Sequence, residues 1–192
     1  MPTVYFIRHG ETDWNVEARL QGQRDVPLNG FGRVQSEEAG IRLRSIAGRC
    51  ETFDYVASPL SRARETMERL RRSIGLPPRA YRIDERLKEL SFGEWEGLTW
   101  REVRSCDPRG AAARERDKWN YVPPGGESYA MLAERIAPVL AEIDGDTVMV
   151  AHGGVARVLI AVIGAAPTRE APLIDIWQGK VLVLRDRGFR WA

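Results

Sequence analysis

The sequence is poor in the residues that form disulfides and metal sites. Two cysteines and two histidines occur in 192 residues. Cys50 and Cys106 stand in neither a C-x-x-C motif nor a zinc-type spacing, and a zinc site needs at least three ligands from the protein. We therefore expect a metal-independent protein that has no bound cofactor and two free thiols.

Long apolar runs and an excess of one charge are also absent. The longest apolar run, Val158 to Ala166, is far shorter than the ~20 residues that cross a bilayer, and no basic leader precedes the first apolar segment. The 29 Lys and Arg residues against 27 Asp and Glu give a formal net charge of +2, too small to indicate a nucleic-acid partner. We expect a cytoplasmic protein that binds neither membranes nor nucleic acids.

No internal repeat and no Gly/Ser/Pro-rich linker divides the chain. A chain of this length can bury roughly 70% of its unfolded surface, which is enough for a real core. We predict one domain over residues 1–192. Within it, residues 92–126 have poor periodicity and mix Trp and Tyr with many charges, so we expect them to form an excursion or lid that sets substrate specificity.

Short apolar runs alternate with helical patterns, which is the order of an α/β fold. Three of these runs are continuous, as is typical of strands that helices cover on both faces: Val4–Ile7, Tyr55–Ala57 and Val148–Ala151. We predict a three-layer αβα fold with a mostly parallel central sheet. Residues 174–191 carry two or three short β patterns, for which we predict edge strands.

Three helices are predicted from the remaining patterns. The first begins at Ser58-Pro59, a good N-cap followed by proline at the first helical position, and stops at Gly75. The second spans about Glu127 to Ile143, and the third about Gly153 to Ile163.

Both histidines follow an apolar strand and precede a glycine, in Ile7-Arg8-His9-Gly10 and Val150-Ala151-His152-Gly153. A single histidine is more often a satisfied core residue than a functional one. Two histidines at equivalent strand ends favour a functional role instead, because ligands of open α/β sheets bind beyond the carboxyl ends of the strands. We expect the two imidazoles to meet at one edge of the sheet.

Positive charge and glycines at the same edge indicate that the ligand is an anion. Arg62 falls in the first turn of the predicted helix, where a cation opposes the helix dipole unless an anion joins it. Gly153-Gly154 opens a helix at a cost of about 1 kcal/mol each relative to alanine, which is reasonable where something approaches the backbone closely.

The two imidazoles and the guanidinium groups of Arg8 and Arg62 suit a phosphoryl group. Phosphoryl transfer needs mainly positioning and neutralisation of charge, which such a cluster supplies without a metal. Histidine can also act as the nucleophile.

An ordered series of motifs over nearly the whole chain resembles the histidine phosphatase superfamily, which includes the cofactor-dependent phosphoglycerate mutases. The motifs are Arg8-His9-Gly10-Glu11-Thr12, Asn15, Gln21-Gly22, Pro27-Leu28 with Gly32, Ser58-Pro59-Leu60-Ser61-Arg62-Ala63 with Glu65-Thr66, Glu89 with Phe92-Gly93 and Glu96-Gly97, Gly125-Gly126-Glu127-Ser128, and His152-Gly153-Gly154. A lone R-H-G would be weak evidence, whereas the ordered series is specific.

The resemblance implies a role for each matched residue. His9 becomes phosphorylated, while Arg8, Arg62 and His152 hold the phosphoryl oxygens. The substrate or phosphate site further comprises Asn15, Gln21, Gly22 and Gly153. Spacing alone leaves three candidates for the general acid, namely Glu89, Glu94 and Glu96, and the family motif selects Glu89.

Three functions are compatible with these motifs. Mutases of the family carry Arg-His-Tyr-Gly where this chain has Leu90–Gly93, and adjacent arginines where this chain has Arg114-Glu115-Arg116. The resemblance therefore favours a phosphatase acting on a small phosphorylated metabolite, with a cofactor-dependent phosphoglycerate mutase as the alternative. An inactive protein that binds phosphorylated ligands is disfavoured, because both His9 and Glu89 are present. A homodimer is compatible with the predicted edge strands.

Overall fold

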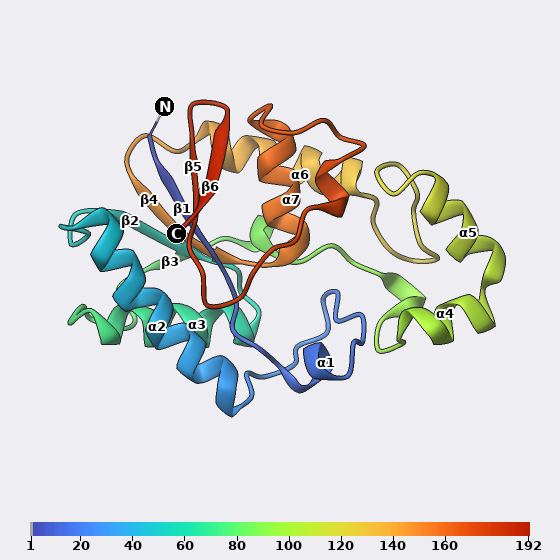
Figure 1. Ribbon diagram of the computed structural model, residues 1–192, viewed down its shortest axis with the longest axis horizontal. Helices are drawn as coiled ribbons and strands as arrows, with labels where there is room; N and C mark the ends of the chain where they lie inside the picture. Colours follow the sequence, from blue (N-terminus) through green and yellow to red (C-terminus); the bar gives the residue numbers. More distant parts are fainter. Residues whose placement is uncertain (1) are drawn as a thin grey trace.

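The computed structural model describes residues 2–192, and its centre is a six-stranded sheet with strand order β3-β2-β4-β1-β5-β6 (Figure 1). The strands are β1 (Val4–Arg8), β2 (Asp54–Ala57), β3 (Arg82–Ile83), β4 (Thr147–Ala151), β5 (Leu182–Arg185) and β6 (Gly188–Trp191). Pairing is parallel from β3 to β1, whereas β5 and β6 are antiparallel to their neighbours. The predicted mostly parallel sheet is confirmed, and the three apolar runs are β1, β2 and β4.

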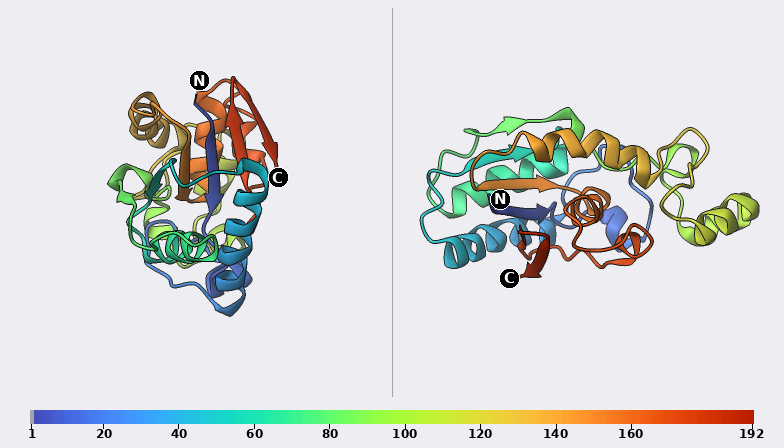
Figure 2. Two further views of the ribbon diagram at one scale, coloured as in Figure 1. Left: turned by 90° about the vertical axis from the view of Figure 1, so that its left-hand side faces the viewer. Right: turned by 90° about the horizontal axis from the view of Figure 1, so that it is seen from above.

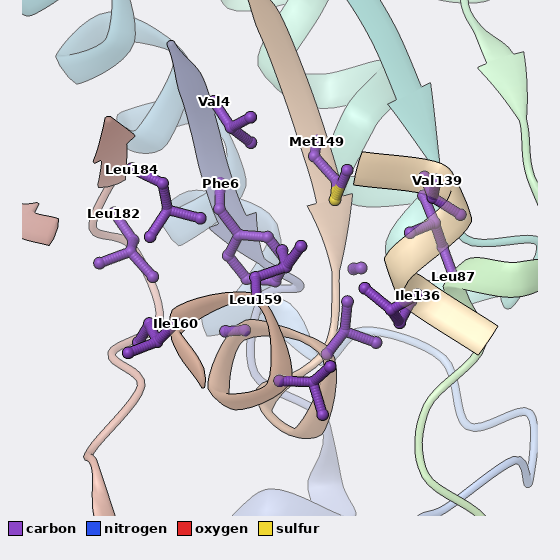
Figure 3. Close-up of a cluster of buried hydrophobic side chains, with 14 of the residues drawn as sticks. Val4, Phe6, Leu87, Ile136, Val139, Met149, Leu159, Ile160, Leu182 and Leu184 are labelled. Carbon is purple, nitrogen blue, oxygen red and sulfur yellow. The ribbon is translucent and has the colours of Figure 1, made fainter. Parts of the chain in front are cut away.

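Helices cover both faces of the sheet, as Figures 1 and 2 show. On one face lie α2 (Gly30–Ala47) and α3 (Ser61–Ser73), and on the other α6 (Tyr129–Ala141) and α7 (Gly153–Val162). Successive residues of a strand point to opposite faces, so Phe6 packs in the core under α6 and α7 (Figure 3), while Ile7 packs in the core under α2 and α3. The continuous apolar strands of the sequence are explained by these two cores.

Two predictions about element positions are wrong in detail. The first predicted helix begins at Ser61 rather than at Ser58, and Leu60 is its N-cap residue. The Ser58 hydroxyl lies 2.7 Å from His152 Nε2 instead. Of the C-terminal strands, only β6 is an edge strand, because β5 lies between β1 and β6. The β5–β6 turn is at Asp186 and Arg187, both of which have a positive φ.

The longest helix, α2, is not foreseen by the apolar pattern, because its buried face consists mostly of small residues, with Leu43 as the one large side chain. A Cβ added at Gly40 would lie 2.2 Å from Ser73 Oγ and 2.5 Å from the Leu70 carbonyl oxygen of α3. A glycine is therefore required where α2 and α3 approach each other.

Residues 92–126 extend beyond one end of the sandwich (Figures 1 and 2) and contain α4 (Trp100–Cys106) and α5 (Pro108–Arg116). A separate small core holds them together, made of Leu20, Trp95, Val103 and Ala111. The remaining short elements are α1 (Asp13–Val16), η1 (Glu85–Leu87), η2 (Gly93–Trp95) and η3 (Ala171–Leu173). No helix within residues 2–192 is both long and apolar enough to cross a membrane.

Candidate active site

A cavity of about 280 Å³ lies where the carboxyl end of β1 and the start of α7 face α5. This volume suits a small metabolite. The lining residues are Arg8, His9, Asn15, Arg19, Leu20, Gln21, Gly22, Arg62, Glu89, Phe92, Trp100, Arg114, Lys118, Tyr129, Gly153, Arg157 and Pro172. The cavity lining therefore brings together all of the sequence-predicted site residues except His152, whose ring centroid lies 5.2 Å from that of His9.

His9 is 3% exposed and follows β1, where its backbone N–H donates to the Ala151 carbonyl of β4. Its Nδ1 is 2.8 Å from the Gly10 carbonyl oxygen, which can only accept, so Nδ1 carries the proton. Burial, followed by the charges of Arg62 and Arg8, holds the pKa of His9 well below its ordinary value. The neutral ring thus keeps its lone pair on Nε2, as a nucleophile requires.

His152 is the N-cap residue of α7, and its ring centroid lies 5.2 Å from that of His9. Its Nε2 is 2.7 Å from the Ser58 hydroxyl, whereas its buried Nδ1 has no hydrogen-bond partner within residues 2–192. Burial first, and then Arg62, His9 and Arg8, hold the pKa of His152 well below its ordinary value. Both imidazoles are therefore neutral near pH 7.

The guanidinium groups of Arg8 and Arg62 are anchored by backbone carbonyls. Arg8 donates to Ile176 at 2.9 Å, and the fully buried Arg62 donates to Gly22 at 2.7 Å and Arg24 at 2.6 Å. Burial and then the charges of Arg157 and Arg62 lower the pKa of Arg8 to about 10, so that it remains a cation near neutral pH. Arg62 therefore also holds the loop that carries Gln21 and Gly22.

Buried polar atoms without a partner gather at this site. Within residues 2–192, five buried side-chain nitrogen or oxygen atoms have no hydrogen-bond partner, and four of them belong to Arg8, Gln21, Arg62 and His152. Buried polar groups are normally paired, because leaving one unpaired costs about 1–3 kcal/mol. Because these groups are concentrated beside His9, we infer that a polar ligand supplies their missing hydrogen bonds.

Glu89 lies at the N-terminus of α7, where both of its carboxylate oxygens accept from the Gly154 N–H, at 3.0 and 3.1 Å. A Cβ at Gly154 would lie 2.4 Å from Glu89 Oε1, whereas a Cβ at Gly153 would make only ordinary contacts of 3.4 Å or more. The expectation that both glycines leave free N–H groups for phosphate is therefore wrong for Gly154, because Glu89 occupies that N–H.

Geometry separates Glu89 from the two other candidate acids. Glu89 lines the cavity, and Glu94 is an exposed residue outside it. Glu96 instead accepts from the backbone N–H groups of Gln23 and Phe92 and closes a loop.

The segment that carries Glu89 is held by a partly buried ion pair. Arg135 donates to the carbonyls of Lys88 and Arg86, and it pairs with Glu127 at 2.9 Å. Glu127 in turn accepts from the Ser91 N–H. These contacts fix the backbone on both sides of Glu89 and so position its carboxylate.

Asn15 and Gly22 shape the opposite wall of the cavity. Asn15 Oδ1 accepts from the Thr12 N–H and from Gln178 Nε2, each at 3.1 Å. Gly22 has φ +51°, and a Cβ there would lie 2.1 Å from Glu96 Oε1. This turn therefore requires glycine.

Several lining residues were missed at the sequence level. Arg157 lies one turn into α7 after Gly153, and this i+4 spacing could have revealed it. Arg114, Lys118 and Trp100 belong to the excursion, whose irregular pattern gave no sign of which side chains point inward. Among residues 2–192, no group of three or more His, Cys, Asp and Glu side chains is arranged to hold a metal ion.

Residues 4–192 match the family model of the histidine phosphatase superfamily (branch 1). A glucosyl-3-phosphoglycerate phosphatase of Mycobacterium tuberculosis (strain ATCC 25618 / H37Rv) is 34% identical over 184 residues, which cover 89% of this chain and 79% of the relative. A 2,3-bisphosphoglycerate-dependent phosphoglycerate mutase of Methylobacterium sp. (strain 4-46) is 32% identical over 190 residues, covering 95% and 90%.

The fold is also similar to solved structures. A mycobacterial glucosyl-3-phosphoglycerate phosphatase, solved with VO3, has a TM-score of 0.83 and 31% identity, covering 100% of this chain and 98% of that one. The sequence-level family resemblance and the three-layer fold are thus confirmed.

Proposed function

This chain belongs to the histidine phosphatase superfamily (branch 1), and on that premise we propose that it hydrolyses phosphomonoesters of small metabolites through a covalent phosphohistidine on His9. The observation that carries the proposal is the gathering of unpartnered polar atoms of Arg8, Arg62 and His152 around the neutral His9 ring. Three donors that face one nucleophile suit the oxygens of a tetrahedral phosphoryl group.

In the first step, the Nε2 lone pair of His9 attacks phosphorus. A phosphorus–nitrogen bond forms and the ester phosphorus–oxygen bond breaks, while a protonated Glu89 gives its proton to the leaving oxygen. Arg8 and Arg62 neutralise charge on the transferring oxygens.

In the second step, water replaces the alcohol. Glu89, now ionised, takes a proton from water as the water oxygen attacks phosphorus, and the phosphorus–nitrogen bond breaks. Inorganic phosphate leaves, and both His9 and Glu89 return to their starting protonation states. Asn15, Gln21, Gly22 and Gly153 are proposed to line the phosphate site throughout.

The same proposal extends to the lid, the cellular location and the oligomeric state. We assign residues 92–126 the role of a lid that sets specificity, since α5 contributes Arg114 to the cavity. A cytoplasmic location fits the two free cysteines, one buried and one exposed. Homodimer formation remains a prediction that light scattering tests.

A panel of phosphorylated metabolites, with inorganic phosphate as the readout and EDTA present, tests the proposed function. We expect hydrolysis by the parent and a loss of at least about 10³-fold in His9→Ala. Equal hydrolysis by the two proteins would rule out the proposed mechanism.

A phosphoglycerate mutase is the second candidate, because a relative of that name matches 95% of this chain. Supplying 3-phosphoglycerate with 2,3-bisphosphoglycerate distinguishes the two. Formation of 2-phosphoglycerate faster than phosphate release would favour the mutase.

A further inference from the structure

A buried serine lies beside His152 at the ends of two neighbouring strands. β2 and β4 run parallel with Ala57 opposite Val150, and the Ser58 N–H continues this ladder by donating to the Val150 carbonyl at 3.0 Å. Ser58 and His152 are both fully buried, and the Ser58 hydroxyl lies 2.7 Å from His152 Nε2. The register of the sheet therefore fixes the residue that follows β2 next to the residue that follows β4.

The Ser58 hydroxyl does not cap the helix that comes after it. Helix α3 begins at Ser61, its N-cap residue is Leu60, and no side chain within residues 2–192 caps it. The Ser58 oxygen does accept from the Leu60 backbone N–H, at 3.4 Å. Because Ser58 Oγ already serves as an acceptor there, its own hydrogen needs an acceptor elsewhere.

His152 Nε2 is that acceptor. In the described part of the chain, no other acceptor lies within hydrogen-bond distance of the Ser58 hydroxyl. If His152 carried its proton on Nε2, the Ser58 hydrogen would be buried without a partner, which is a costly arrangement. If Nε2 carries a lone pair, Ser58 donates to it and the hydroxyl is fully paired. Since the ring is neutral, its proton is then on Nδ1.

Nδ1 is the nitrogen of His152 that is left for the phosphoryl group. It is buried and has no hydrogen-bond partner among residues 2–192, and the ring centroid lies 5.2 Å from that of His9. Phosphoryl oxygens carry negative charge and accept hydrogen bonds. An Nδ1–H attracts such an oxygen, whereas a lone pair on Nδ1 repels it. The tautomer of His152 therefore decides whether this side chain can hold the phosphoryl group.

We propose that Ser58 is a positioning residue that fixes the Nδ1–H tautomer of His152, so that this imidazole donates to a phosphoryl oxygen. The inference rests on the proposed function, in which His152 holds that oxygen. The two histidines thus share one tautomer for opposite uses. The Gly10 carbonyl at Nδ1 of His9 leaves the Nε2 lone pair free to attack phosphorus, whereas the Ser58 hydroxyl at Nε2 of His152 leaves the Nδ1–H free to bind oxygen.

Nitrogen NMR of the imidazoles in the resting protein measures the tautomer directly. The chain has two histidines, so the spectrum of His152→Asn assigns both rings. At neutral pH we expect both rings of the parent to carry their proton on Nδ1. In Ser58→Ala, His9 should be unchanged, while the His152 proton should move partly or wholly to Nε2, because Nε2 no longer has a donor. A His152 proton on Nε2 in the parent, or an unchanged His152 tautomer in Ser58→Ala, would overturn the proposal.

Ser58→Ala should also lower kcat/KM for a turned-over phosphomonoester by about 10–100-fold. A loss of that size is typical where a metal-ligating histidine loses the partner that fixes its tautomer, and we expect the same of a phosphoryl-binding histidine.

Thr147→Val is the matched control, because it also removes a buried hydroxyl. Thr147 is 1% exposed, begins β4 at the end of the strand away from His152, and donates to the Gly145 carbonyl at 2.8 Å. This variant should keep the parental kcat/KM and the parental His152 tautomer. Equal losses of kcat/KM in Thr147→Val and Ser58→Ala would count against a specific role of Ser58.

Binding of inorganic phosphate separates this proposal from the proposed function. If no phosphomonoester is hydrolysed, the phosphatase proposal fails. The parent should then still bind inorganic phosphate about tenfold more tightly than Ser58→Ala in calorimetric titrations, because a hydrogen bond to a charged group is lost. Equal affinities would end the Ser58 proposal independently. If Ser58→Ala does not fold, as judged by thermal melting, the His152 tautomer of the parent decides the proposal without it.

Discussion

The two ends of the cavity are built in different ways. At one end, His9 and His152 follow neighbouring strands, which are held in register by five residue pairs between β1 and β4. At the other end, Arg114 and Trp100 lie on short helices supported by a small separate core. We therefore propose that the sheet positions the groups that react with the phosphate, whereas residues 92–126 supply groups that select the substrate.

Glu89→Gln should produce the largest effect and sharpens this division. A general acid contributes typically 10²–10⁴-fold, so alkyl phosphates should lose turnover in that range. The loss of kcat/KM, which reports the step that forms the phosphohistidine, should be smaller on aryl phosphates, whose oxygens leave without much help. Steady-state kinetics on an alkyl and an aryl phosphate measures it. An equal loss of kcat/KM on the two would count against Glu89 as the acid.

Gly154→Ala tests how the sheet end positions that acid. The added methyl group would lie 2.4 Å from Glu89 Oε1, so the carboxylate must move, and we expect a loss of about 10–100-fold in kcat. Gly30→Ala is the matched control, because Gly30 also lies at the start of a helix, its methyl group would meet nothing within 4 Å, and it does not line the cavity. The interpretation fails if the two variants are equally active.

Trp100→Leu tests the lid end with a smaller change. Removing the ring over which Arg114 lies should raise KM for the substrate identified in the metabolite panel by about twofold to fivefold and leave kcat unchanged, since a cation–π contact contributes about 0.5–1 kcal/mol. Trp177→Leu, at a position that is 55% exposed and outside the cavity, controls for loss of a tryptophan. A loss of kcat with an unchanged KM in Trp100→Leu would instead place Trp100 with the groups that react with the phosphate.

The smallest effect is on the free energy of unfolding, and it depends on the two histidines at the sheet end of the cavity. The folded state holds the pKa values of His9 and His152 below their unfolded values, so the unfolded state binds more protons below about pH 6.5. Stability is therefore complete above that pH and falls as the pH decreases. Between pH 7 and 5.5, the free energy of unfolding should fall by ~1 kcal/mol for each histidine.

Urea denaturation at the two pH values measures this change. His152→Asn should reduce the decrease from ~2 to ~1 kcal/mol. The carboxylates with lowered pKa values, such as Glu65 and Asp84, act in the same direction but at lower pH. An unchanged decrease in the variant would show that His152 titrates normally in the folded protein.

The same division explains what could be predicted from the sequence. His9, Arg62 and His152 could be identified from the sequence. The residues that follow parallel strands, and those that begin the next helices, lie at one edge of the sheet. Helix α2 was missed because Gly40 and other small residues replace the apolar stripe at its contact with α3. Arg114 was named only as part of an interrupted arginine pair, because packing against Phe92 and Trp100 from other segments decides where it points.

The central claim is a covalent bond between phosphorus and His9, and trapping that bond tests it most directly. Rapid mixing with a turned-over phosphomonoester, a quench that preserves phosphoramidates, and peptide mass spectrometry should locate one phosphoryl group on His9. With an aryl phosphate, whose oxygen leaves with little help from an acid, Glu89→Gln should accumulate more of this species, because hydrolysis of the phosphohistidine lacks the base. Steady turnover with an unmodified His9, or a phosphoryl group on another residue, would contradict the account.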